Sequence, residues 1–337
     1  MQPPARNRKQ KITDTLAKAG LDSFLLALIG MIVLAYFFPY PGTSASPFYL
    51  AAIANYAVSL IFFFYGLRLS PTKLRAGLGN WRLHTVIHLT TFVLFPLLVL
   101  SLRGLFIASS AQTQWLAVFY LSALPSTVSS SVVMVSIAGG NLPGAIFNAS
   151  ISSLLSVFLT PLWMGLFLQS GSGGFDPGPV IGKLVLQVLV PVTLGILLNA
   201  RWGGFAERHK KHLSRLDQTI ILLIVYTSFC ESFAEGVFHS YRVQDIFWLG
   251  LGMLGLFFML FFVVRLISHL LHFNREDRIT ALFCGSKKSL VHGTVMSGIL
   301  FPDAAVAGVM LLPLMLYHTL QLLAASIIAQ AMARQKK

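Results

Sequence analysis

Long apolar stretches, separated by short polar or basic segments, occupy almost the whole chain. An α-helix needs about 20 apolar residues to cross the hydrocarbon core of a bilayer, and each stretch meets that length within a few residues. The pattern therefore predicts an all-α membrane protein with ten transmembrane helices. Their expected ranges are 21–38, 48–67, 83–102, 115–137, 142–168, 180–199, 216–236, 244–264, 279–300 and 304–332.

The composition agrees with a membrane protein and excludes other classes. Of the 337 residues, 55% are hydrophobic and 11% are charged, and the mean hydropathy of +0.75 is too high for a soluble domain of this size. The net charge of +14 would suit a nucleic-acid partner, but the basic residues form short clusters between apolar stretches. The cysteines, Cys230 and Cys284, lie in apolar stretches and predict neither a disulfide framework nor a zinc site.

The basic residues also predict an orientation. Most of the 25 lysines and arginines fall in the chain ends and in alternate loops, whereas the opposite side carries only Arg103 and Arg242. By the positive-inside rule both termini of this multi-pass membrane protein are cytoplasmic. Residues 1–20 then form a basic cytoplasmic N-terminus, followed by an uncleaved first helix at 21–38. A cleaved signal peptide is the alternative.

A glycine-rich loop at 169–179 divides the predicted helices into two sets of five, residues 21–169 and 180–333. Because five is odd, the second set enters the membrane from the opposite face, which is the arrangement of an inverted repeat. The two halves show no obvious letter-by-letter similarity, so this prediction depends on topology alone.

Polar residues interrupt the fourth and the ninth predicted helices at corresponding places. The fourth contains Pro125 to Ser131, with five hydroxyl residues after the proline, and the ninth contains Phe283 to His292, with Lys287 and Lys288 side by side. Ammonium groups at membrane depth are costly unless they meet water, an anion or a carboxylate. Irregular backbone is tolerated there only where it lines a cavity or is buried in protein. Paired interruptions of this kind indicate a transporter's binding site.

Other polar residues of the predicted helices are candidates for the same site. Glu231 is a candidate counter-charge for the lysines, and His292 follows Lys288 by one helical turn. Together with residues of the two interruptions, we predict substrate or ion binding at Ser129, Ser130, Ser131, Asn148, Glu231, Ser286, Lys287, Lys288, Ser289 and His292, and weaker roles for Thr127 and Ser152. The alternatives are that the hydroxyl residues pack helices together, that the lysines extend to the interface, and that His292 is a packed, hydrogen-bonded residue.

Several segments resemble the bile acid:sodium symporter superfamily, and within it the YfeH-like bacterial branch related to the sodium/bile acid cotransporter 7 type. The resemblance covers nearly all ten predicted helices. The segments that carry it are Asn80 to His84, Thr91 to Pro96, Ala138 to Asn141, Asp217 to Thr219, Tyr226-Thr227 with Glu231, and Phe283 to Leu290. It implies a panel domain of helices within 21–67 and 180–236, and a core domain of helices within 83–168 and 244–332. Unwound parts of helices four and nine would cross in the core.

The resemblance also implies where this chain departs from its sodium-coupled relatives. A glutamine of their third helix falls on Thr91, which is therefore also predicted to have a weaker role in the site, and the glutamate of their ninth-helix motif falls on Phe283. Their Gln-Asn pair falls on Lys287 and Lys288. A cationic site without its carboxylate should repel sodium, since a unit charge at about 4 Å contributes roughly 4 kcal/mol at an effective dielectric of 20. A lysine could stand in for the coupling ion, pair with an anionic substrate, or titrate and couple transport to protons.

The predicted function is secondary active transport of an organic anion by alternating access. The expected substrate is a bile acid, a steroid conjugate or another amphipathic acid, with the lipid bilayer as the other partner and no cofactor. Sodium coupling is not expected, and proton coupling is an alternative. A second hypothesis, suggested by the cotransporter 7 relatives, is a regulatory membrane protein of the same fold in calcium homeostasis. An intramembrane hydrolase is a third; no serine is singled out as its nucleophile, and there are no predicted catalytic residues or metal ligands. The oligomeric state is left open.

Overall fold

The computed structural model describes residues 23–68, 79–105, 109–168, 182, 185–236, 242–301 and 303–334, and all regular structure in these ranges is helical. Seven helical segments there are long and apolar enough to cross a membrane: Leu50–Arg68, Trp81–Gly104, Leu142–Phe167, Val185–Arg208, Lys210–Ala234, Val243–Leu270 and Ala304–Arg334. The chain is therefore a multi-pass helical membrane protein. The basic segment 1–20 and the glycine-rich loop 169–179 lie outside the described residues.

The other three expected helices differ from the simple pattern. The first corresponds to α2 (Ser23–Phe37), which is shorter than the predicted span. The fourth corresponds to two helices, α7 (Ser109–Ala123) and α8 (Ser129–Ala138). The ninth likewise corresponds to α14 (Arg275–Gly285) and α15 (Leu290–Leu300). Hydropathy averages over such breaks, because it is taken over a window of about 19 residues and each break is much shorter than that.

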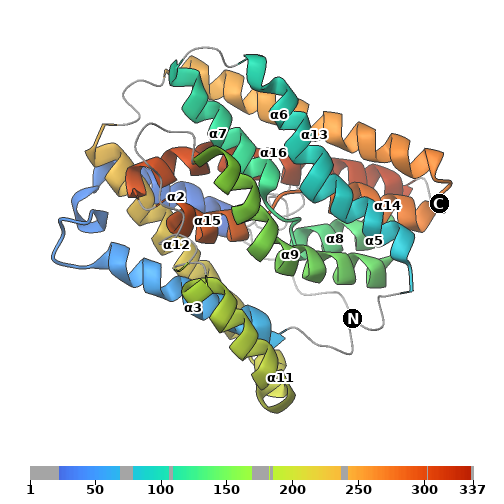
Figure 1. Ribbon diagram of the computed structural model, residues 1–337, viewed down its shortest axis with the longest axis horizontal. Coiled ribbons are helices and arrows are strands. Elements are labelled where there is room, and N and C mark those ends of the chain that lie inside the picture. Colours follow the sequence, from blue (N-terminus) through green and yellow to red (C-terminus); the bar gives the residue numbers. More distant parts are fainter. Residues whose placement is uncertain are drawn as a thin grey trace, which may run out of the picture.

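One group of helices consists of α2, α3 (Leu50–Arg68), α11 (Val190–Arg208) and α12 (Lys210–Ala234). Within it, α3, α11 and α12 project together from the rest of the molecule (Figure 1). A short 3₁₀ turn, Tyr40–Gly42, follows α2 and packs on α12, where Tyr226 donates a hydrogen bond to the carbonyl of Phe38.

The other group contains the remaining helices. Three helical segments follow one another without a gap: α5 (Trp81–Leu89), a π-helical stretch (Thr90–Leu94) and α6 (Phe95–Ser101). They are joined by α7, α8, α9 (Leu142–Leu168), α13 (Val243–Leu270), α14, α15 and α16 (Ala304–Arg334). Outward-facing side chains of α13, such as Phe247, Phe258 and Phe262, are exposed and apolar, as expected of a surface that meets lipid. The two groups meet where α12 packs on α15 and α16.

Two glycines allow the backbones of α3 and α11 to come into direct contact. A Cβ added to Gly66 would collide with the carbonyl oxygen of Val192, and one added to Gly195 would collide with the carbonyl oxygen of Phe63 and the amide of Leu67. Small residues at membrane helix contacts permit this close approach, and the packing that results is what holds such helices together.

Gly195→Ala is expected to destabilise the protein by about 1–3 kcal/mol, since the added methyl group meets backbone atoms that cannot rotate away. The measurement is thermal unfolding of the purified protein in lipid nanodiscs. Gly165→Ala on α9 is the matched control, because a Cβ there would have nothing within 4 Å. Equal stability of the two variants would contradict the close contact between α3 and α11.

A single carboxylate joins the N-terminal ends of three helices in the second group. Asp277 Oδ2 accepts hydrogen bonds from Asn80 Nδ2 at 2.8 Å and Asn274 Nδ2 at 3.2 Å, and Asp277 Oδ1 accepts one from Asn141 Nδ2 at 2.7 Å. Asn80 also caps α5 and Asn274 caps α14, while Asn141 directly precedes α9. Helix N-termini carry partial positive charge, which the carboxylate offsets.

Candidate functional site

The two helix breaks have local causes in the sequence. Pro125 lacks an N–H and cannot continue the hydrogen-bonding pattern of α7, which ends at Ala123. In the other break α14 ends at Gly285, and Ser289 begins α15 by accepting a hydrogen bond from the backbone N–H of His292. Serine is a favoured residue at this position because its oxygen satisfies an otherwise unpaired amide.

The breaks contact each other, so their freed backbone groups find partners across the gap. The N–H of Ser289 donates to the carbonyl of Pro125 at 2.9 Å. The hydroxyl of Ser131 donates to the carbonyl of Phe283 at 3.0 Å. The structure therefore brings together the two polar interruptions that the sequence singled out separately.

The ammonium group of Lys288 is completely coordinated by backbone oxygens. Its Nζ donates to the carbonyls of Thr91 at 2.8 Å, Ser122 at 2.6 Å and Leu124 at 2.7 Å. An ammonium group has three N–H donors, and each has one acceptor here. The ring of Phe95 lies 4.5 Å from the same nitrogen, and the side chain is fully buried.

The three carbonyls are available because of irregular backbone. Ser122 and Leu124 lie where α7 ends. The last carbonyls of a helix receive no hydrogen bond from an N–H group of the same helix. Thr91 belongs to the π-helical stretch, which displaces carbonyls from the regular pattern. Thr91 thus contributes its backbone oxygen, whereas its buried hydroxyl has no hydrogen-bond partner in the structure. The site resembles a cation-binding site occupied by a tethered cation.

Helix α16 supplies residues that the sequence interpretation missed. The side-chain amide of Gln321 pairs with the backbone of Lys288, accepting from its N–H at 2.8 Å and donating to its carbonyl at 2.7 Å. The hydroxyl of Tyr317 donates to the carbonyl of Ser286 at 2.7 Å. Both side chains are fully buried. The sequence does contain a signal for Gln321, since it is an amide residue within a long apolar stretch, and buried polar groups in membranes need partners.

Lys287 has a different environment from its neighbour. Its Nζ donates to the hydroxyl of Ser130 at 2.8 Å, and this is its one hydrogen bond within the described residues. Ser130 donates to Thr127 at 2.9 Å, and Thr127 lies 2.6 Å from Ser131. Since the proton of Ser131 is used on the carbonyl of Phe283, Thr127 is the donor to Ser131. A directed chain of hydroxyl groups therefore begins at Lys287.

A cavity of about 470 Å³ lies between the two groups of helices. Ser130, Thr127 and His292 line it where the helix breaks meet, and Arg68 and Asp217 line it from α3 and α12. The volume lies within the range of sites for small molecules. Neither lysine lines this cavity directly, but Lys287 is separated from it only by Ser130.

The remaining predicted site residues have different surroundings. His292 lines the cavity, with its Nδ1 atom 3.0 Å from the hydroxyl of Ser289. Ser152 accepts from the N–H of Ser126, within the first break, at 3.0 Å. Asn148 and Ser286 each donate to a carbonyl four residues earlier in their own helices. The side chain of Ser129 lies outside what the structure describes.

Glu231 does not lie with the lysines. Its two carboxylate oxygens accept hydrogen bonds from the backbone and side chain of Ser44, at 3.0 and 2.7 Å. The structure records an ion pair between Arg68 and Asp217, and among the carboxylates that it describes none forms an ion pair with Lys287 or Lys288. The expected counter-charge is therefore replaced, for Lys288, by three neutral carbonyls.

Comparison with known proteins identifies the family. The model of the SBF-like CPA transporter family matches residues 22–334. The uncharacterized protein PA2026 of Pseudomonas aeruginosa is 40% identical over 315 residues, which are 94% of each chain, and the "Putative symporter YfeH" of Escherichia coli K12 is 39% identical over 316 residues, also 94% of each. The sodium/bile acid cotransporter 7 of Danio rerio is 28% identical over 319 residues, covering 93% of this chain and 94% of its own.

These matches confirm the resemblance read from the sequence. The relatives named for an activity are transporters or symporters, not enzymes. The contacts of Ser130 with Lys287 and of Ser289 with His292 are accordingly not interpreted as a hydrolase's nucleophile and base. The chain belongs to the SBF-like CPA transporter family.

Proposed function

We propose that this protein is a secondary active transporter of an organic anion that works by alternating access. The proposed panel comprises α2, α3, α11 and α12, and the proposed core comprises the other helices. The cavity between these groups supports the proposal, because a substrate there would contact both moving parts. In this proposal α7–α8 and α14–α15 are the discontinuous helices four and nine of two inverted five-helix repeats, with both termini in the cytoplasm of a bacterial cell.

Lys288 is proposed to act as a permanent substitute for a coupling cation. The observation that carries this proposal is the complete coordination of its Nζ by three carbonyls from α7 and the π-helical stretch. A tethered ammonium occupies the place where a free cation would otherwise be needed to hold these segments together. Transport is then independent of sodium.

Lys287 is proposed as the group that couples transport to protons. It is fully buried, makes one hydrogen bond, and reaches the cavity through the hydroxyl of Ser130. Buried lysines change protonation readily because burial disfavours the charged form. The hydroxyl chain from Ser130 to Ser131 offers a route for a proton at the meeting point of the two breaks.

Uptake into proteoliposomes tests the proposed function. With a panel of amphipathic organic anions, uptake is expected to be unchanged within about twofold when sodium is replaced by potassium, and to increase with an inward proton gradient. Lys287→Met is expected to remove the response to the gradient by at least tenfold while the protein remains folded, as judged by size-exclusion chromatography.

Sodium-dependent uptake would contradict the role given to Lys288. A response to the proton gradient that survives in Lys287→Met would contradict the role of Lys287. If no anion in the panel is taken up, transport is refuted and the regulatory alternative gains support.

A further inference from the structure

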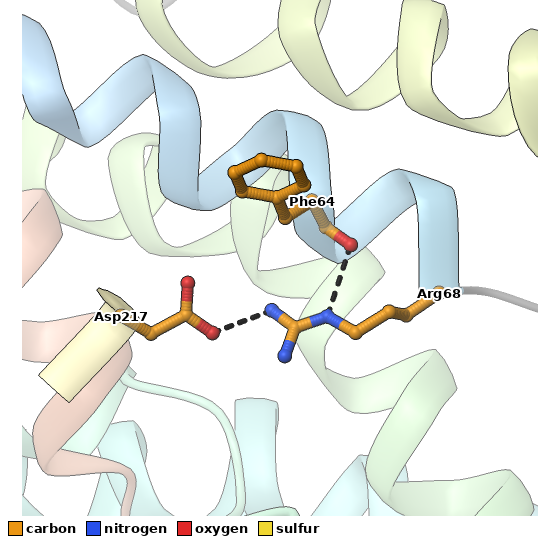
Figure 2. A network of polar contacts seen from close by, with 3 residues as sticks. All are labelled: Phe64, Arg68 and Asp217. Atoms are coloured by element: carbon orange, nitrogen blue, oxygen red, sulfur yellow. Dashed lines mark hydrogen bonds and ion pairs between the residues drawn. The ribbon is translucent and has the colours of Figure 1, made fainter. Parts of the chain in front are cut away.

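The Arg68–Asp217 ion pair forms part of the cavity wall, away from the two helix breaks. Arg68 is the last residue of α3 and Asp217 lies on α12, and their atoms Nη2 and Oδ2 are 2.6 Å apart. Arg68 Nε also donates to the carbonyl of Phe64 at 3.0 Å. Figure 2 shows these two contacts, and the third guanidinium nitrogen makes no hydrogen bond with the residues drawn.

Among the residues that the structure describes, the pair leaves much of its hydrogen-bonding capacity unused. A guanidinium group has five N–H donors, and the structure assigns two of them. Asp217 Oδ1 is buried without a partner, so the contact is single and not the two-bond arrangement that arginine and carboxylate groups favour. An ion pair that served only to hold α3 against α12 would be expected to use both oxygens.

The remainder of the cavity suits a molecule with an apolar body. Phe62, Phe147, Ile221 and Leu322 line it together with the polar residues of the breaks. Lys210 and Glu207 also line it, so the charges of the wall balance when Arg68 and Asp217 are included. An entering anion therefore needs a cation that can offer additional donors, and Arg68 is the cavity residue with such donors in a fixed orientation.

We propose that Arg68 receives the anionic group of an amphipathic monoanion, a carboxylate or a sulfonate, and that Asp217 is a positioning residue that orients the guanidinium. This inference rests on the proposed transport function and identifies the anion-binding residue that the lysines do not provide. Lys288 has no donor left, and Lys287 is separated from the cavity by Ser130.

The test measures equilibrium binding of radiolabelled taurocholate and of dodecanoate to the full-length protein in nanodiscs. Arg68→Gln is expected to weaken binding at least tenfold. Asp217→Asn is expected to strengthen it at least threefold, because it removes the competing charge and keeps a hydrogen-bond acceptor. A purely structural ion pair predicts that both variants weaken binding, and that result would overturn the proposal.

Three controls separate binding from folding. The Arg68→Gln/Asp217→Asn double variant removes both charges together and is expected to remain monodisperse and to bind as weakly as Arg68→Gln. Arg215→Gln is the matched control, because Arg215 is exposed on α12 and does not line the cavity; its binding is expected to equal that of the unaltered protein. The uncharged methyl ester of cholate is expected to bind equally to the unaltered protein and to Arg68→Gln.

Binding and uptake measured on the same preparations keep this inference distinct from the proposed function. Uptake of an anion with an unchanged KM in Arg68→Gln would leave transport intact and overturn the role of Arg68. Arginine-dependent binding without uptake in any gradient would support the anion site and refute transport. If the unaltered protein binds neither anion, the ligand class assigned to Arg68 is wrong.

Discussion

Lys288→Ala is expected to abolish transport and to destabilise the protein by at least about 3 kcal/mol. The substitution leaves three buried carbonyls, those of Thr91, Ser122 and Leu124, without the donor that each has now. An unsatisfied buried acceptor costs about 1–3 kcal/mol, and Thr91, Ser122 and Leu124 are all fully buried. Thermal unfolding in nanodiscs measures the stability, and proteoliposome uptake measures the activity.

Chemical rescue makes this prediction specific. Methylammonium supplies the missing N–H donors without a tether, so it is expected to restore part of the stability of Lys288→Ala in a saturable manner. Tetramethylammonium has the same charge but no N–H and is expected to restore nothing. Sodium is also expected to stabilise the variant, because carbonyl oxygens are suitable ligands for a hard cation.

Lys287→Ala is the matched control for this experiment. It removes the neighbouring lysine, which makes one hydrogen bond to a hydroxyl group, so a loss of only about 1–2 kcal/mol is expected and no rescue by methylammonium. If Lys288→Ala is as stable as Lys287→Ala, or if tetramethylammonium rescues as well as methylammonium, coordination by the three carbonyls is not what stabilises the crossing.

Asp277→Ala is expected to cost at least about 4 kcal/mol, for a different reason. The carboxylate accepts three hydrogen bonds, from Asn80, Asn141 and Asn274, and hydrogen bonds to charged groups contribute about 1.5–3 kcal/mol each. Its loss releases the N-terminal ends of α5, α9 and α14 together. Thermal unfolding and the fraction of monodisperse protein are the measurements.

Asp303→Ala provides the comparison for Asp277→Ala. Asp303 accepts hydrogen bonds from the N–H groups of Ala305 and Val306 at the start of α16 and is exposed. Removing a helix-capping residue of this kind typically costs about 1 kcal/mol. A similar small effect for Asp277→Ala would show that the three helix ends are held by packing and not by the shared carboxylate.

Much of the architecture follows from the sequence because membrane insertion imposes simple requirements. A stretch such as Val243–Leu270 is apolar on all sides, so hydropathy alone identifies it as a helix in lipid. The interruptions at Pro125 and at Lys287-Lys288 are visible for the same reason, since polar residues stand out in an apolar sequence. Hydropathy could not show where the two shorter helices of each interrupted span end and begin, because it averages over the breaks.

The roles of individual side chains depended on distances that no pattern contains. Glu231 lies in an apolar stretch and carries the right charge to pair with a lysine, yet it accepts hydrogen bonds from Ser44. Gln321 was overlooked although its amide pairs with the backbone of Lys288. Arg68 and Asp217 are 149 positions apart, so the sequence shows two separate charges and not an ion pair.

The sequence by itself determined a multi-pass helical membrane protein of a transporter family, with two polar interruptions and a lysine pair as its chemical centre. These features depend on the cost of polar groups in lipid, which is a property of composition and spacing. Only the tertiary structure decided that adjacent lysines differ: Lys288 meets three carbonyls, and Lys287 meets one hydroxyl. The reason is that backbone carbonyls are identical in every sequence, and irregular backbone, at a helix end or in a π-helical stretch, determines which of them remain free to coordinate a cation.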